Sequence, residues 1–122
     1  MDSYLYKEEI IEHYKDPQNF GKIGVYDISS KQLNPFCGDE IEMFVKYSHD
    51  TVASIGFLGH GCAISIAATS MLTEHALNKS KEELTKFSQE DMLILLGVEV
   101  SETRKKCALL GWAVLQDCLD SK

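Results

Sequence analysis

Long hydrophobic runs are missing from this sequence. The longest apolar runs, such as residues 92–96, fall far short of the roughly 20 residues that cross a bilayer. The first residues, 1–9, are acidic and aromatic, and they lack the basic and apolar regions of a secretory signal. We therefore expect a cytoplasmic protein without a membrane partner, whose cysteines stay reduced rather than paired in disulfides.

Positive charge is scarce as well. The chain holds 12 Lys and Arg against 19 Asp and Glu, which gives a formal net charge of -7. Because a phosphate backbone attracts basic surfaces, we expect no nucleic-acid partner. The sequence also has no nucleotide-binding glycine loop, no Gly-x-Ser-x-Gly elbow and no His-Glu-x-x-His motif, so these common catalytic patterns are excluded.

Hydrophobic periodicity predicts a single α+β domain over residues 1–122. A two-residue period predicts a strand at 41–47, a short turn at 48–50 makes 51–58 its antiparallel partner, and residues 25–33 are interpreted as a weak third strand. Helical spacing and capping residues predict helices at 4–14, 63–78, a short stretch after Ser80, 89–96 and 102–119. Strands followed by helices favour a three-stranded antiparallel sheet with helices packed on one face.

Three of the four cysteines have distinctive neighbours. Cys37 lies in a Pro-Phe-Cys-Gly turn before a predicted strand, with Asp39 two residues further on. Cys62 follows Gly-His-Gly at a predicted helix start, and Cys107 lies about two turns into the last predicted helix. Three thiols and one carboxylate from such distant segments can form a four-coordinate metal site. If the segments converge, the sequence predicts a protein that handles metal or sulfur.

Each of these residues also has a plain structural interpretation. Cys37 would then be a small residue in an ordinary turn, and Cys62 a buried cysteine at a tight turn rather than a thiolate at a helix N-terminus. Taken alone, Cys107 is typical of a helix core. Arg104 lies on the same helical face as Cys107. Its guanidinium either favours the charged thiolate form of nearby cysteines or is a solvated surface charge.

Two further residues are predicted to lie outside the site. Cys118 is eleven residues after Cys107, which places it roughly 16 Å away along a helix axis, so we expect it to serve packing. His60, two residues before Cys62, is interpreted as a loop residue rather than a ligand. A cysteine hydrolase with His60 as its base remains an alternative, which three motif-embedded cysteines disfavour.

Taken together, three segments resemble the IscU/SufU/NifU N-terminal family of iron–sulfur cluster assembly proteins. They are residues 6–21, 34–39 and 59–65, and the resemblance extends over nearly the whole chain. It implies an α+β fold whose cysteines converge at one exposed end. It also implies one ligand set, made up of Cys37, Asp39, Cys62 and Cys107.

This chain combines features of two branches of that family, IscU and SufU. Lys106 stands where the IscU branch usually has a histidine, and residues 101–104 lack its Pro-Val-Lys segment for a DnaK-type chaperone. The stretch from Arg104 to Trp112 resembles the SufU branch. Yet Cys62 and Cys107 are only 107 − 62 = 45 residues apart, which leaves no room for the usual SufU insertion.

The resemblance implies a scaffold. A cysteine desulfurase would deliver persulfide sulfur, and a transient [2Fe–2S] cluster would form on the ligand set and pass to an acceptor protein. Thiolates suit such clusters, and the single harder carboxylate of Asp39 is expected to make this one labile. We favour this hypothesis and expect Zn2+ in the isolated protein.

Two alternatives remain. The first is a zinc-dependent sulfurtransferase, in which one zinc ligand, expected to be Cys37, leaves the metal and attacks the persulfide while Arg104 replaces it electrostatically. The second is a structural zinc module, which a carboxylate ligand argues against because such sites are usually built from cysteine and histidine.

Overall fold

The computed structural model describes residues 8–35 and 38–120 of the chain. Within these ranges the helices and strands are α1 Glu8–Lys15, β1 Ile28–Asn34, β2 Asp39–Ser48, β3 Thr51–His60, α2 Ala63–Ala76, α3 Lys81–Thr85, α4 Gln89–Leu96 and α5 Glu102–Asp120. The strands form one antiparallel sheet in the order β1-β2-β3. The predicted α+β meander is therefore confirmed.

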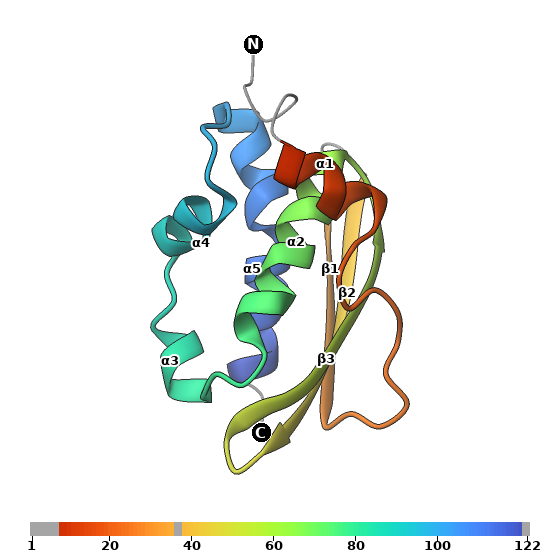
Figure 1. The fold of residues 1–122 in the computed structure, drawn as a ribbon, viewed down its shortest axis with the longest axis vertical. Coiled ribbons are helices and arrows are strands. Elements are labelled where there is room, and N and C mark those ends of the chain that lie inside the picture. Colours follow the sequence, from red (N-terminus) through yellow and green to blue (C-terminus); the bar gives the residue numbers. More distant parts are fainter. Residues whose placement is uncertain (1–7, 36–37, 121–122) are drawn as a thin grey trace.

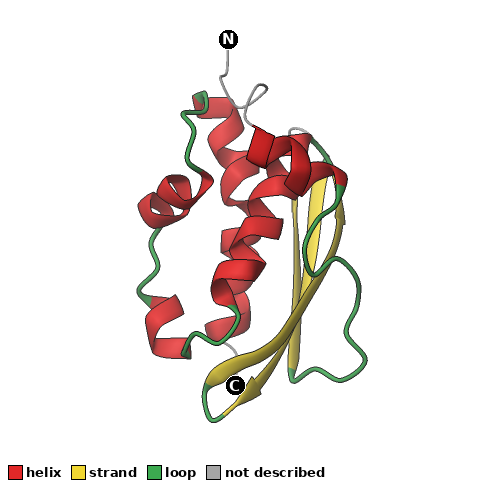
Figure 2. Ribbon diagram, viewed as in Figure 1, coloured by secondary structure: helices red, strands yellow, loops and turns green. Residues whose placement is uncertain are grey.

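The helices lie on one side of the sheet (Figure 2). The two long helices, α2 and α5, lie between the sheet and the short helices α3 and α4 (Figure 1). At the upper end of the molecule in Figure 1, β3 leads into α2 and α5 begins, so two segments far apart in sequence meet there. Among the described residues, none of the helices combines the length and apolar character that crossing a bilayer takes.

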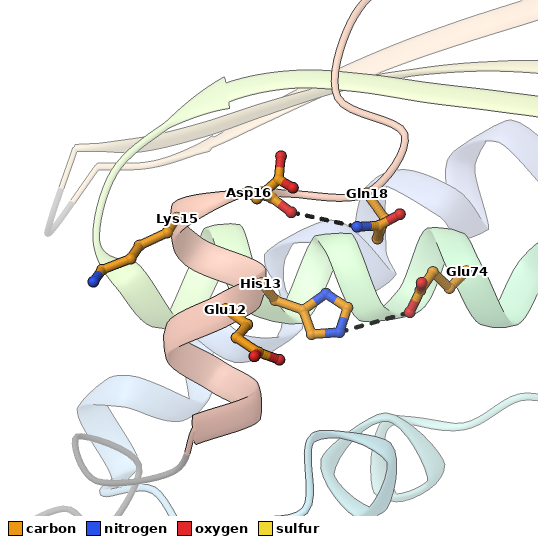
Figure 3. Close-up of a pocket in the computed structure, with 6 residues that line it drawn as sticks. All are labelled: Glu12, His13, Lys15, Asp16, Gln18 and Glu74. Atoms are coloured by element: carbon orange, nitrogen blue, oxygen red, sulfur yellow. Dashed lines mark hydrogen bonds and ion pairs between the residues drawn. The ribbon is translucent and has the colours of Figure 1, made fainter.

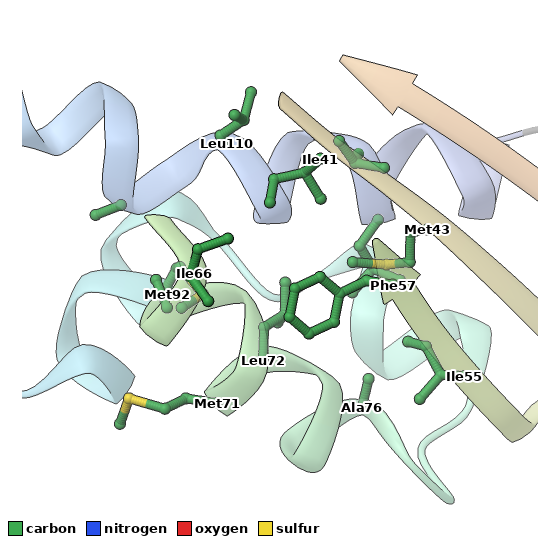
Figure 4. Packing of buried hydrophobic residues seen from close by; sticks show 14 of the residues in the cluster. Ile41, Met43, Ile55, Phe57, Ile66, Met71, Leu72, Ala76, Met92 and Leu110 are labelled. Atoms are coloured by element: carbon green, nitrogen blue, oxygen red, sulfur yellow. The ribbon is translucent and has the colours of Figure 1, made fainter. Parts of the chain in front are cut away.

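The core is formed where the inward-facing side chains of the sheet meet α2 and α5 (Figure 4). Ile41, Met43 and Phe57 from the sheet and Leu72 from α2 are all fully buried. Because successive side chains of a strand point to opposite faces, alternation within β2 sends Ile41 and Met43 to the same helix-covered face. The predicted two-residue period therefore identifies the buried face of β2 correctly.

The helix ends follow local capping chemistry. Ser80 begins α3 and Ser88 begins α4, each in a capping box with the residue three positions later, Glu83 or Asp91. Gly97 ends α4 in the left-handed conformation, with φ of 81°. A glycine adopts this conformation without the steric cost that a Cβ brings, so the predicted boundaries of α4 are correct.

The segment after α1 forms backbone hydrogen bonds with Phe57 on the outer edge of β3. The N–H of Gly21 donates to the carbonyl oxygen of Phe57 at 2.7 Å, and the N–H of Phe57 donates to that of Asn19 at 3.0 Å. The predicted first helix at 4–14 begins outside the described residues, and its described part ends at Lys15, before Pro17. This segment then crosses to β1, which begins at Ile28 rather than at residue 25.

Candidate metal centre

Three of the four predicted ligands converge at the end of the sheet where α2 and α5 begin. One ligand atom from each of Asp39, Cys62 and Cys107 lies within 4.8 Å of the other two. Asp39 is the first residue of β2, Cys62 immediately precedes α2, and Cys107 is near the start of α5. The fourth predicted ligand, Cys37, lies outside the described residues.

The antiparallel register of β2 and β3 brings two of these ligands together. Glu40 pairs with His60, so Asp39 lies opposite the turn that leads into α2. Cys62 occupies the N-cap position of α2 with an extended backbone. Packing of α2 against α5 then supplies Cys107 from a segment 45 residues further on (107 − 62).

The carboxylate of Asp39 is held by the backbone of Cys62. Oδ1 accepts a hydrogen bond of 2.9 Å from the Cys62 N–H, and Oδ2 lies 3.8 Å from the Cys62 Sγ. Asp39 and Cys107 are 0% and 1% exposed, whereas Cys62 is partly exposed. Of the described thiols, Cys62 is therefore the one that a partner protein reaches most easily.

The arrangement fits a thiolate-rich metal site. With zinc–sulfur bonds of about 2.3 Å and zinc–oxygen bonds of about 2.1 Å, neighbouring ligand atoms of a tetrahedral site are roughly 3.6 Å apart. The observed 3.8 Å between Asp39 Oδ2 and Cys62 Sγ is close to this spacing. Two sulfurs and one carboxylate oxygen suit zinc or an iron–sulfur unit better than a hard cation such as Mg2+.

The basic residues at the start of α5 lie beside this site in sequence. Arg104 is partly buried in the first turn, one turn before Cys107, as the helical spacing predicts. Its backbone N–H donates to the Ser101 hydroxyl at 3.3 Å, so Ser101 caps the start of α5. Lys105 forms a salt bridge with Glu102, with 2.9 Å between Nζ and Oε2.

His60 is not part of the ligand group. It ends β3 instead of lying in a loop, and its side chain is 71% exposed. Its Nε2 lies 3.1 Å from Glu40 Oε1, while Lys31 Nζ lies 3.2 Å from Glu40 Oε2. Hydrogen bonds from Lys31 and His60 lower the pKa of the Glu40 carboxyl.

Cys118 is a core residue, as predicted. It is fully buried in α5, and this burial, with a smaller effect of the neighbouring Asp117 charge, raises the pKa of its thiol to about 12. A thiol that stays protonated is a poor metal ligand and a poor nucleophile.

One polar cluster has no counterpart in the sequence analysis. His13 Nδ1 lies 2.6 Å from the Ser70 hydroxyl, and its Nε2 lies 3.6 Å from Glu74 Oε1 (Figure 3). The Gln18 N–H also donates to the Ser70 hydroxyl, at 2.7 Å. His13, Gln18 and Glu74 line a pocket of about 450 Å³ between α1 and α2, together with Glu12, Lys15 and Asp16.

This cluster fastens α1 and the following loop to α2. The sequence signal that could have found it is Ser70, a polar residue inside the apolar helix at 63–78. A buried hydroxyl needs a hydrogen-bond partner, either a carbonyl of its own helix or a group from elsewhere in the fold. His13 supplies one, and we assign the cluster a structural role.

Comparison with known proteins gives a consistent picture. The family model described as NifU-like N terminal domain matches residues 5–121. The iron-sulfur cluster assembly scaffold protein IscU of Streptococcus pyogenes serotype M1 is 33% identical over 135 aligned positions, covering 96% of this chain and 84% of that protein. The zinc-dependent sulfurtransferase SufU of Bacillus subtilis (strain 168) is 34% identical over 132 positions, covering 92% and 87%. Both alignments exceed the 122 residues of this chain, so both relatives carry residues that it lacks.

Solved structures agree with the fold. A putative iron-sulfur cluster assembly scaffold protein for the SUF system, FiSufU from Fervidobacterium islandicum AW-1, superposes with a TM-score of 0.84 at 28% identity. The match covers 97% of this chain and 99% of FiSufU. The N-terminal part of a NifU-like protein from Brucella abortus, at 17% identity and a TM-score of 0.78, shares the fold.

Proposed function

This chain belongs to the NifU-like N terminal domain family, and on that premise we propose that it is a scaffold for iron–sulfur cluster assembly. Persulfide sulfur from a cysteine desulfurase would be reduced to sulfide by a thiol or another electron donor and would combine with ferrous iron in a transient [2Fe–2S] cluster, which then passes to an acceptor protein. The observation that carries the proposal is the convergence of Asp39, Cys62 and Cys107, whose ligand atoms lie within 4.8 Å of one another. Cys37 is proposed as the fourth ligand.

Sulfur transfer to this site needs an accessible thiolate. The thiolate attacks the outer sulfur of the desulfurase persulfide, a new S–S bond forms, and the desulfurase cysteine leaves as a thiolate. Cys37 is the proposed acceptor because it lies in a predicted loop. Among the described thiols, Cys62 is the second candidate for the persulfide acceptor because it is partly exposed, whereas Cys107 is buried.

Release of the cluster depends on Asp39 in this proposal. Iron–sulfur clusters are normally held by thiolates, and a carboxylate oxygen is a harder ligand that suits them less well. One carboxylate among three thiolates would weaken the binding of the cluster to the protein without abolishing it. Arg104 is proposed to offset the negative charge that the cluster and its thiolates bring to the start of α5.

A zinc-dependent sulfurtransferase is the second candidate, and two observations favour it. The stretch from Arg104 to Trp112 resembles the SufU branch, and the relative described as a zinc-dependent sulfurtransferase is 34% identical. FiSufU matches this chain almost end to end, so lack of the usual SufU insertion does not argue against a SUF-type protein. In this case zinc on the same ligands would hold the thiolates ready for persulfide attack.

Anaerobic reconstitution distinguishes the two candidates. The protein is mixed with a cysteine desulfurase, cysteine and ferrous iron, and visible absorption and bound metal are followed together. A scaffold gains sulfide-to-iron absorption and passes it to an apo-acceptor. A sulfurtransferase keeps its zinc, gains no cluster and accelerates desulfurase turnover.

A further inference from the structure

The turn before Cys62 passes unusually close to the side chain of Asp39. A Cβ placed on Gly61 would overlap Asp39 Oδ1 and would lie 2.7 Å from its Cγ and 2.9 Å from its Cα. The φ of Gly61 is +144°, a conformation that residues with a side chain rarely adopt. Only a glycine therefore lets the backbone run against this carboxylate.

This close approach brings the next N–H group onto the carboxylate. The Cys62 N–H donates to Asp39 Oδ1 at 2.9 Å, while Oδ2 lies 3.8 Å from the Cys62 Sγ. A hydrogen bond from an N–H to a carboxylate is short and strong because the acceptor is charged. Through it, two of the proposed ligands are fixed relative to each other.

We infer that Gly61 is a positioning residue that makes Asp39 a one-oxygen ligand, with Oδ1 held by the Cys62 N–H and Oδ2 presented to the metal. This inference rests on the proposed metal site and adds the binding mode of its carboxylate. Rotating Asp39 so that both oxygens face the metal would break the hydrogen bond and leave the Cys62 N–H without this acceptor, which is unfavourable. The clamp therefore restricts the carboxylate to one orientation.

The first test compares Gly61→Ala with Gly21→Ala. Gly21 has a similar φ of +128°, yet a Cβ there meets nothing within 4 Å, so this variant reproduces the backbone strain without touching Asp39. Zinc affinity is measured by competition with a chromophoric chelator, and the thermal midpoint is measured in parallel. Loss of the groups that orient metal ligands typically weakens binding about 10–100-fold. We expect a loss of that size for Gly61→Ala and parental affinity for Gly21→Ala.

Parental zinc affinity in both variants would overturn the inference while leaving the metal site intact, and an equal loss in both would assign the effect to backbone strain and overturn it as well. Failure of the parent protein to bind zinc would overturn both the site and the inference. The two results are therefore distinguishable.

A second measurement uses the unaltered protein, in case Gly61→Ala does not fold. Amide hydrogen exchange at Cys62 is followed by NMR with and without zinc. The inference predicts slow exchange in both states, because Oδ1 keeps its hydrogen bond when Oδ2 binds metal. Exchange that accelerates on zinc binding would show that Oδ1 has turned to the metal, and would refute the one-oxygen mode.

Discussion

Gly111 of α5 lies directly against Thr69 of α2, so that a Cβ at Gly111 would overlap the Thr69 hydroxyl. Thr69 is fully buried, and its hydroxyl donates to the carbonyl oxygen of Ser65 at 2.8 Å. Glycine inside a helix costs roughly 0.5–1 kcal/mol relative to alanine, so this close contact explains its presence. The same contact holds together the two helices that carry Cys62 and Cys107.

Gly111→Ala should therefore destabilise the fold although alanine favours helix. We expect a loss of about 1–3 kcal/mol in the free energy of unfolding, the usual range for overpacking a core. Urea unfolding followed by circular dichroism measures it. The double variant Thr69→Ala, Gly111→Ala makes room for the new methyl group and should recover part of the loss. A single variant as stable as the parent would contradict the close-packing account.

The two cysteines of α5 supply a matched pair for metal binding. Both are buried, but only Cys107 has its sulfur near Asp39 and Cys62. Cys107→Ser should lose stoichiometric zinc, measured by mass spectrometry under native conditions. Cys118→Ala should keep it, with a modest loss of thermal stability from the small cavity that it leaves. Zinc retained by Cys107→Ser would remove Cys107 from the ligand set.

Replacing Asp39 should make a reconstituted cluster longer-lived. In the Asp39→Ala variant the harder oxygen ligand is gone, so we expect slower loss of visible absorption than in the parent. This variant also deprives the Cys62 N–H of its acceptor, which costs about 1–3 kcal/mol. Asp39→Asn keeps an acceptor oxygen and should unfold at higher denaturant concentration than Asp39→Ala. Equal cluster lifetimes in parent and Asp39→Ala would argue against a releasing role for Asp39.

His75 should make stability depend on pH in the weakly acidic range. Burial, with a smaller effect from Lys79, lowers the pKa of His75 below its ordinary value of 6.5, and its ring stacks on Phe87. The unfolded chain therefore binds this proton more readily, and stability falls as pH drops from 6.5 toward the folded-state pKa. His75→Phe should flatten that part of the urea-midpoint profile. His49→Gln, at an exposed turn, is the control and should leave it as in the parent.

Local sequence patterns were sufficient for most of the fold. The two-residue period at 41–47 places Ile41 and Met43 on one face, and both are buried, because that pattern depends only on the pleat of one strand. The predicted bounds of α4, 89–96, are correct because its capping residues, Ser88 and Gly97, act on neighbouring residues. β1 begins later than predicted, at Ile28: the Asp27 N–H still donates to the Val45 carbonyl oxygen, but the Tyr47 N–H donates to the Asp27 carboxylate rather than to a backbone carbonyl of an extended β1.

Contacts between distant segments could not be read in the same way. The meeting of Asp39, Cys62 and Cys107 was expected only because the motifs resemble a known family. The hydrogen bond between His13 and Ser70 joins residues 57 positions apart, and although a polar Ser70 in an apolar helix signals that a partner is needed, no local pattern identifies His13 as that partner. The approach of Gly61 to Asp39 depends on the register of β2 and β3, which a two-residue period leaves undetermined.

The most direct test of the central claim is X-ray absorption at the zinc edge of the zinc-loaded protein. Coordination by Cys37, Asp39, Cys62 and Cys107 predicts three sulfur neighbours at about 2.3 Å and one oxygen at about 2.0–2.2 Å. The Asp39→Asn variant should then lose the carboxylate oxygen while the sulfurs remain. A first shell of nitrogen and oxygen atoms, or one that Asp39→Asn leaves unchanged, would contradict the proposed site.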